Sequence, residues 1–144
     1  MHTDRPGNIV PYNMPHGKVV LTTPMRILIV DDNRDILDLV QRVLAAEGYD
    51  IITARNGIEA LQREAELTPD LIVLDVNLPY LDGWEVCRQI KARRSVPIII
   101  LSVRAEAIDI ERSRAAGADD HLFKPFEISD LLNRIERIAG MPPK

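Results

Sequence analysis

The feature that most constrains the fold of this chain is a repeated alternation of two kinds of segment. Short apolar runs, bounded by charged residues, glycine or proline, occupy residues 27–30, 51–53, 71–74, 98–101 and, more weakly, 121–123. Continuous apolar runs of this length are typical of strands that are buried on both faces of a sheet. After each run, apolar residues recur at three- and four-residue spacing, which indicates a helix with one buried face.

The five helical stripes predict five helices that alternate with the five strands. The stripes cover residues 36–44, 58–65, 86–90, 108–115 and 128–138. Strand–helix alternation of this kind implies an α/β fold with a parallel sheet covered by helices on both faces. Because crossovers are right-handed, few topologies remain, and we expect a flavodoxin-like, doubly wound five-stranded sheet with strand order 2-1-3-4-5.

The ends of the 144-residue chain differ from its centre. Four of the ten prolines fall in the first 24 residues and two in the last three. Residues 1–24 show no steady period, so we expect a flexible N-terminal tail there, with one short extended piece at 18–22. The remaining chain predicts one domain over residues 25–140 and a C-terminal tail over 141–144.

Composition excludes several classes of function. The chain has 18 basic and 22 acidic residues, whereas a general nucleic-acid grip needs a basic surface. The single cysteine, Cys87, excludes an intrachain disulfide and a cysteine-cluster metal site. No apolar run approaches the roughly 18 residues of a membrane span, and residues 1–24 lack a secretory pattern. We therefore expect a cytoplasmic protein that binds neither membranes nor, directly, nucleic acid.

Residues that carry chemistry follow four of the five predicted strands. They are Asp31 and Asp32 after the first strand, Asp75 after the third, Ser102 at the end of the fourth and Lys124 after the fifth. In an open parallel sheet, ligands bind beyond the carboxyl ends of the strands where the strand order reverses. We therefore expect the three carboxylates to converge between the first and third strands, with Ser102 and Lys124 beside them.

Three carboxylates in one crevice repel one another, and Lys124 supplies a single positive charge. A hard divalent cation, Mg²⁺ or Mn²⁺, suits the remaining negative charge, because it accepts carboxylate oxygens and keeps open positions. An aspartate, such a cation, a lysine ammonium and a hydroxyl together fit phosphoryl transfer to a carboxylate.

Four segments, in this order, resemble the response-regulator receiver domain of two-component signalling. They are LIVDDN (28–33), LIVLDVNLPYLDG (71–83), PIIILS (97–102) and GADDHLFKPF (117–126). The resemblance covers about residues 25–139. It implies that Asp75 is the phosphoacceptor and that Asp32, Asp75 and the backbone carbonyl of Asn77 bind the metal, with Asp31 acting mostly through a coordinated water.

The resemblance also assigns roles around the phosphoacceptor. Lys124 pairs with a phosphoryl oxygen and, before phosphorylation, with Asp75, while the Ser102 hydroxyl donates to the phosphoryl group and moves toward it. His121 occupies the switch position, whose ring turns inward and remodels the face made by the fourth helix, fifth strand and fifth helix. The Lys124–Pro125 bond is expected to be cis.

Three residues depart from the family pattern or leave two interpretations. His121 stands where tyrosine or phenylalanine is commoner, so a plain strand-end histidine is the alternative to a switch. Val103 is bulkier than the usual alanine or glycine, and we expect it to narrow the path to Asp75. Arg104 either overhangs the site or is solvated.

The predicted function is a phosphorylation-activated receiver that accepts a phosphoryl group on Asp75 from a histidine kinase or phosphotransfer protein. It turns over its own phosphoryl group but no external substrate. One alternative is the N-terminal receiver of a DNA-binding transcriptional regulator. Two others are a Mg²⁺-dependent aspartyl-phosphate phosphatase, disfavoured because Asp31 and Asp32 are adjacent, and a receiver-like binding module that is never phosphorylated.

The output is less constrained by the sequence. Only GMPPK follows the fifth helix, so we expect either a separate downstream protein partner or an output domain outside this sequence. A homodimer through the fourth helix, fifth strand and fifth helix is a further possibility. Its charged residues are Asp119, Asp120, Asp130 and Arg134, whereas Ile110 and Arg114 depart from the usual pattern.

Overall fold

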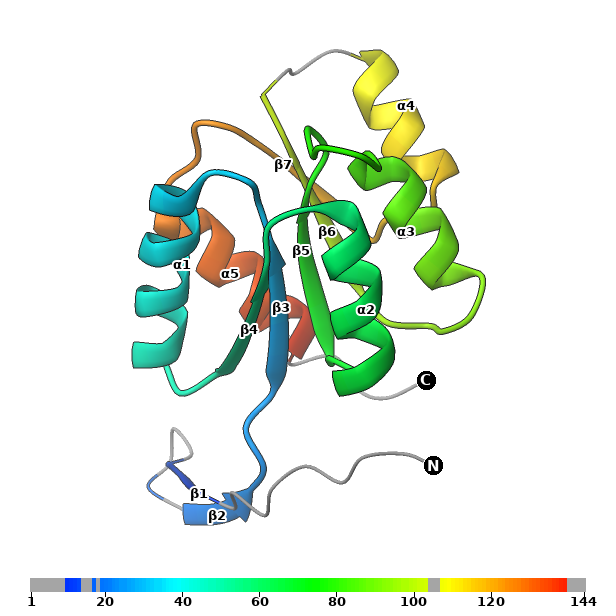
Figure 1. Ribbon diagram of the computed structural model, residues 1–144. Helices are drawn as coiled ribbons and strands as arrows, with labels where there is room; N and C mark the ends of the chain where they lie inside the picture. Colours follow the sequence, from blue (N-terminus) through cyan, green and yellow to red (C-terminus); the bar gives the residue numbers. More distant parts are fainter. Residues whose placement is uncertain (1–9, 14–16, 18, 104–106, 140–144) are drawn as a thin grey trace.

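The computed structural model describes residues 10–13, 17, 19–103 and 107–139. Its centre is a parallel sheet of five strands in the order β4-β3-β5-β6-β7 (Figure 1). The strands are β3 (Arg26–Val30), β4 (Asp50–Ala54), β5 (Leu71–Asp75), β6 (Ile98–Ser102) and β7 (Asp120–Phe123). When these five strands are numbered in chain order from β3, the order is 2-1-3-4-5, so the predicted topology is confirmed.

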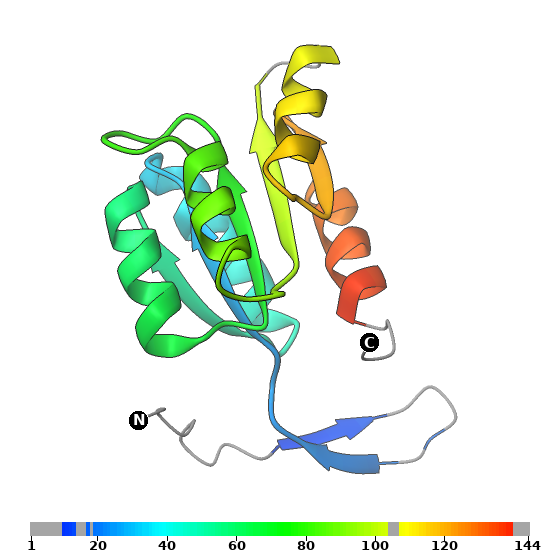
Figure 2. The same ribbon diagram turned by 90° about the vertical axis from the view of Figure 1, so that its right-hand side faces the viewer.

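Five helices cover the two faces of the sheet (Figures 1 and 2). They are α1 (Arg34–Ala46), α2 (Gly57–Leu67), α3 (Gly83–Lys91), α4 (Ala107–Ala115) and α5 (Ile128–Ala139). Helices α1 and α5 lie on one face, and α2, α3 and α4 lie on the other. The predicted α/β fold with five helices is thereby confirmed.

The core consists of two apolar layers, because successive side chains of a strand point to opposite faces of the sheet. Ile27 and Ile29 of β3 pack in the layer beneath α1 and α5, with Leu37 and Ile135. Leu28 and Val30 belong to the opposite layer, which α2 and α3 cover. A strand buried on both faces must be apolar throughout, which is why the short apolar runs predicted the strands.

Capping residues fix the starts of two helices, α1 and α3, which follow the ends of strands β3 and β5. The Asn33 side chain caps α1 by accepting hydrogen bonds from the backbone N–H groups of Asp35 and Ile36. Asp82 caps α3 by accepting from the N–H of Glu85. A Cβ atom on Gly83 would collide with the Asp75 carbonyl, so glycine lets α3 begin directly against the end of β5.

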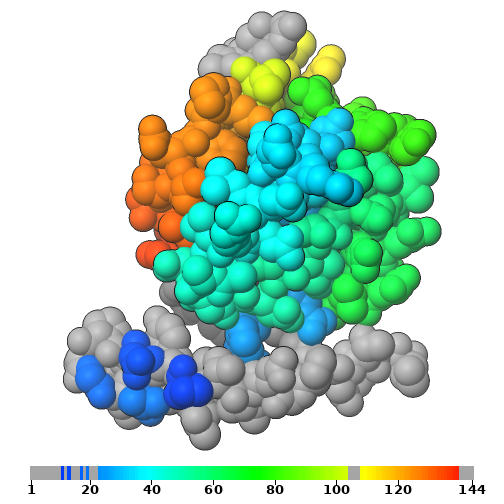
Figure 3. Space-filling model, turned by 60° about the vertical axis from the view of Figure 1, so that its left-hand side comes forward, coloured from blue at the N-terminus to red at the C-terminus, as the bar shows by residue number. Residues whose placement is uncertain are grey.

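The N-terminal segment contains a feature that the sequence did not predict. Strand β1 (Val10–Asn13) pairs antiparallel with β2 (Val19–Thr22), and Val10 lies opposite Thr22. Strand β2 overlaps the extended piece expected at 18–22, whereas β1 was expected to lack regular structure. The hairpin lies at the end of the domain where β3 begins, opposite the carboxyl ends of the strands (Figures 1 and 3). The flexibility of residues 1–24 stays a prediction.

Two further observations concern the described residues. The peptide bond between Lys124 and Pro125 is cis, as expected. Within the parts of the chain that the structure describes, no helix combines the length and apolarity that crossing a membrane requires.

Candidate functional site

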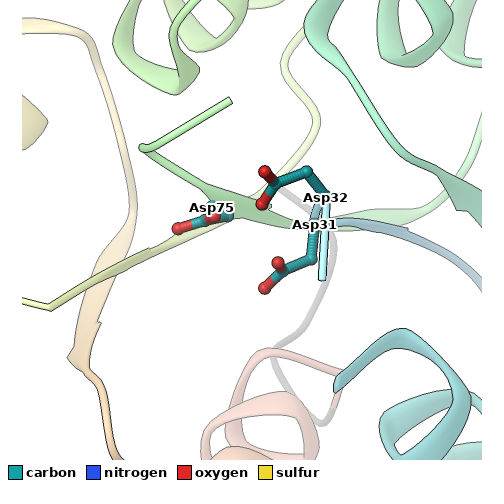
Figure 4. Close-up of side chains that lie close together, drawn as sticks. All are labelled: Asp31, Asp32 and Asp75. Atoms are coloured by element: carbon teal, nitrogen blue, oxygen red, sulfur yellow. The ribbon is translucent and has the colours of Figure 1, made fainter. Parts of the chain in front are cut away.

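The three predicted acidic residues lie together beyond the ends of β3 and β5. One carboxylate oxygen from each of Asp31, Asp32 and Asp75 lies within 4.8 Å of those of the other two. Figure 4 shows the three side chains side by side at the strand ends. Asp31 and Asp75 are 1% and 3% exposed, whereas Asp32 is exposed to solvent. Because β3 and β5 are neighbours in the sheet, residues 44 positions apart form one acidic cluster.

Lys124 reaches this cluster from the end of β7. Its Nζ atom lies 2.6 Å from Oδ2 of Asp31 and 3.5 Å from Oδ1 of Asp75. The short charge-assisted hydrogen bond is thus with Asp31, and the contact with Asp75 is a longer ion pair. Asp31 also accepts a hydrogen bond of 2.9 Å from the backbone N–H of Asn33, so its carboxylate is held from two sides.

Asp75 is the least satisfied member of the cluster. Its Oδ1 atom is buried and has no hydrogen-bond partner of good geometry in the described part of the chain. Burial, together with the negative charge of Asp31, raises the pKa of Asp75 to about 6, although Lys124 and the backbone of Asn77 act in the opposite direction. A buried carboxylate oxygen without a hydrogen bond is costly, and a cation or a covalent substituent would remove that cost.

Ser102 and His121 lie on the other side of the phosphoacceptor position, on β6 and β7. The Ser102 Oγ atom is 2.7 Å from Nε2 of His121. The His121 ring is half-buried and faces Ser102, so in this structure the ring is already on the inward side. Burial lowers the pKa of His121; Asp109 and Asp120 raise it, and Arg134 adds to the lowering.

Val103 lines both of two hollows that flank the site. Its side chain is 56% exposed. It lines an apolar groove with Leu39, Lys124 and Phe126, and a more polar hollow that Asn77, Ser102, Trp84 and Arg112 also line. This position is compatible with control of access to Asp75. Arg104, the second residue predicted to modulate access, lies outside the described residues.

Asn77 follows β5 by two residues and is exposed, and its role as a metal ligand through the carbonyl stays a prediction.

The sequence did not assign a role to two other residues of this region. Trp84 is half-buried and donates a hydrogen bond to Ser113 Oγ at 3.1 Å. Ser113 is 3% exposed and lies 2.7 Å from His121 Nδ1. A serine on a weakly amphipathic helix gives no sequence signal for such a contact.

The comparison with known families agrees with this geometry. The model of the response regulator receiver domain matches residues 27–136. The chain therefore belongs to the response-regulator receiver family and is a receiver domain. Receiver domains of this family bind Mg²⁺ at an acidic cluster like the one formed by the three aspartates.

Curated relatives include response regulators, one of which is described as DNA-binding. The response regulator MprA of Mycobacterium leprae is 44% identical over 115 residues, which are 79% of this chain and 50% of that protein. The DNA-binding response regulator MtrA of Mycobacterium tuberculosis is 38% identical over 114 residues, again 79% of this chain and 50% of the relative. The chain thus spans about half the length of the curated relatives that it matches.

Solved structures match over nearly their whole length. The chemotaxis response regulator CheY4 of Vibrio cholerae is 31% identical, with a TM-score of 0.77, and the match covers 81% of this chain and 99% of that one. The receiver domain of the sensor histidine kinase PA1611 of Pseudomonas aeruginosa is 33% identical, with a TM-score of 0.76 and 83% and 100% coverage. That structure has a magnesium ion coordinated in its active-site cleft.

The raised pKa of Asp75 predicts how the metal-free protein responds to pH. Its folded-state pKa of about 6 exceeds the ordinary 3.8, so the free energy of unfolding falls as pH rises from about 4 to about 6 and stays low above that. The Asp75→Asn variant carries no charge, and we expect it to be more stable than the wild type by about 1–3 kcal/mol at neutral pH.

Urea unfolding in the presence of a chelator measures this difference. The gain is expected at about pH 7.5. It should shrink as the pH falls through about 4, because Asp75 is protonated in both states only below its ordinary pKa of 3.8. Asp38→Asn, on the exposed surface of α1, is the matched control and should change little. Equal stabilities of wild type and Asp75→Asn at neutral pH would contradict the prediction.

Proposed function

We propose that this receiver domain accepts a phosphoryl group on Asp75 and works as a phosphorylation-controlled switch in two-component signalling. The observation that carries the proposal is the Oδ1 atom of Asp75, which lies buried beside two other carboxylates and one ammonium and receives no hydrogen bond from the described residues. A nucleophilic oxygen that is free of hydrogen bonds is ready to attack phosphorus.

The charge of the site supports a divalent cation. Three carboxylates and one ammonium leave an excess of two negative charges, which a divalent ion would neutralise. Asp32, Asp75 and the backbone carbonyl of Asn77 would hold Mg²⁺ or Mn²⁺, and Asp31 would act through a coordinated water. When bound, the ion would offset the charge on the phosphoryl oxygens.

The residues of the chain divide the work of the transfer. The Asp75 carboxylate forms the new oxygen–phosphorus bond while the phosphorus–nitrogen bond of the donor's phosphohistidine breaks, and the electron pair stays on the leaving imidazole. Lys124, whose Nζ lies 3.5 Å from Asp75 Oδ1, would pair with a phosphoryl oxygen. The Ser102 hydroxyl would donate a hydrogen bond to another.

The contact between Ser102 and His121 would carry the signal outward. A hydroxyl that engages the phosphoryl group changes what His121 bonds, and His121 lies on β7 between α4 and α5. We propose that the face formed by α4, β7 and α5 responds to phosphorylation. The donor would be a histidine kinase or a histidine phosphotransfer protein in the cytoplasm.

We infer the output of this domain from its relatives. The family relationship and the DNA-binding relative favour a receiver that controls a DNA-binding transcriptional regulator, and a separate downstream protein is the alternative. The domain itself would turn over only its own phosphoryl group and no external substrate.

Incubation with acetyl phosphate and Mg²⁺ tests the proposal directly. We expect intact-mass spectrometry to show one added phosphoryl group, and peptide mapping to place it on Asp75. The Asp75→Asn variant should take up none, and a chelator should abolish labelling of the wild type. Asp38→Asn is the matched control and should be labelled normally.

Each alternative predicts a different result. A variant Asp75→Asn that is labelled as efficiently as the wild type would reject Asp75 as the acceptor. Steady turnover of a phosphomonoester would support an aspartyl-phosphate phosphatase. A wild type that neither takes up phosphoryl nor responds to Mg²⁺ with beryllofluoride would be a receiver-like binding module.

Val103 yields a second prediction at the same site. Its exposed side chain lines both hollows that flank Ser102 and Lys124, so its bulk should slow the approach of water or donor to Asp75. We expect Val103→Ala to speed phosphoryl turnover by about two- to tenfold, a barrier change of up to about 1.4 kcal/mol. Decay of the phosphorylated form, followed after removal of acetyl phosphate, measures this. Equal lifetimes would remove the role of Val103.

The homodimer stays a prediction, and two ion pairs within the chain bear on it. Arg134 donates a 2.6 Å hydrogen bond to Asp120 of the same chain, and Lys91 pairs with Asp119 at 2.6 Å. A dimer held by charges on the α4–β7–α5 face would need Asp119, Asp120 and Arg134 to exchange these partners for partners across the interface. Light scattering should then show a doubled mass on addition of beryllofluoride, whereas an unchanged mass would reject activation by dimerisation.

A further inference from the structure

Four side chains from four different elements form a continuous chain of hydrogen bonds that ends beside the phosphoacceptor. Trp84 of α3 contacts Ser113 of α4, Ser113 contacts His121 of β7, and His121 contacts Ser102 of β6. The distances are 3.1 Å from Trp84 Nε1 to Ser113 Oγ and 2.7 Å for each of the two bonds to the imidazole ring. Ser102 and Ser113 are both 3% exposed.

The first member fixes the direction of the bonds. An indole N–H donates and never accepts, so Ser113 Oγ accepts from Trp84. Among the residues that the structure describes, the other hydrogen-bond partner of Ser113 Oγ is Nδ1 of His121. If Nδ1 carried a proton, Ser113 would accept twice and its own buried hydroxyl proton would lack an acceptor, which is unfavourable.

The bond from Ser113 also determines which nitrogen of the His121 ring carries the proton. With Nδ1 accepting from Ser113, a neutral His121 carries its single proton on Nε2 and donates it to Ser102. The lowered pKa of His121 supports the neutral ring. Ser102 therefore accepts from His121 and does not use its own hydroxyl proton in that bond.

The consequence concerns the group that Ser102 would bind. Ser102 ends β6, the strand that pairs with β5, and Asp75 ends β5. In the direction derived above, Ser102 can donate to a phosphoryl oxygen on Asp75 and keep its bond to His121. With the opposite direction, Ser102 would donate its hydroxyl proton to the ring. It would then have to break that hydrogen bond before it could donate to the phosphoryl group.

We propose that Trp84 and Ser113 are positioning residues, which hold His121 as the Nε2–H tautomer and so direct the Ser102 hydroxyl proton toward the phosphoryl group. Because each donor in such a chain polarises the next, the three bonds also connect α3 and α4 to the state of Asp75. The guanidinium of Arg112 lies 5.0 Å from the centre of the Trp84 ring and supports its orientation. This inference rests on the proposed function for its effect on phosphorylation, and on geometry alone for the tautomer.

Nitrogen-15 NMR of the histidine ring measures the tautomer without phosphorylation. We expect the wild type to show a protonated Nε2 and an unprotonated Nδ1 on His121. Trp84→Phe frees Ser113 to accept from the ring, and Ser113→Ala removes the hydroxyl that donates to Nδ1, so both should raise the Nδ1–H population. Ser113→Thr keeps the hydroxyl and should restore the wild-type tautomer. Ser95→Ala, in an exposed loop, is the matched control.

Labelling with acetyl phosphate measures the effect on function in the same variants. Loss of one hydrogen bond to the phosphoryl group corresponds to about a three- to tenfold slower uptake in Ser113→Ala and Trp84→Phe. Ser113→Thr should recover the rate, and urea unfolding shows whether each variant is folded.

The outcomes separate the inference from the proposed function. A wild-type His121 with its proton on Nδ1 overturns the inference, whatever the labelling shows. Normal labelling rates in folded Ser113→Ala and Trp84→Phe also overturn it, while leaving the proposed function intact. A wild type that is never labelled on Asp75 overturns the proposed function itself, and the NMR result then still decides the direction of the bonds.

Discussion

The arrangement of the site depends on one buried carboxylate oxygen, on Asp75, for which the described residues supply no hydrogen bond of good geometry. Asp75 lies 3% exposed at the end of β5, beside Asp31, with Lys124 as a counter-charge whose short bond is to Asp31. Such a group destabilises the metal-free fold at neutral pH, as its raised pKa indicates. A buried carboxylate that lowers stability is typical of a functional site. The groups around Asp75 fit phosphoryl transfer.

Each part of the fold contributes to that arrangement. The parallel sheet brings the ends of β3 and β5 together, and Gly83 allows α3 to begin against the Asp75 carbonyl. On the other side, β6 and β7 present Ser102 and His121, and α4 supplies Ser113. The site is therefore enclosed by the starts of helices and the ends of strands. A chemical change at Asp75 would affect residues of several elements at once.

The sequence predicted the sheet well because strands buried on both faces leave continuous apolar runs, and because right-handed crossovers restrict the topology. It also placed Asp31, Asp32 and Asp75 in one cluster. It missed the β1–β2 hairpin, since residues 10–22 show no alternation and Pro11 argues against a strand. It could not predict that Lys124 bonds most closely to Asp31, or that Ser113 contacts His121, because side-chain geometry decides both.

The most direct test of the account is a crystal structure with Mg²⁺ and beryllofluoride, a tetrahedral group that stands in for phosphoryl. The account predicts beryllium bonded to Oδ1 of Asp75, Lys124 Nζ in contact with one fluorine, and Ser102 Oγ donating to another while it remains hydrogen-bonded to His121. A beryllofluoride group bound at another residue, or an Asp75 that stays unmodified at saturating concentration, would contradict it.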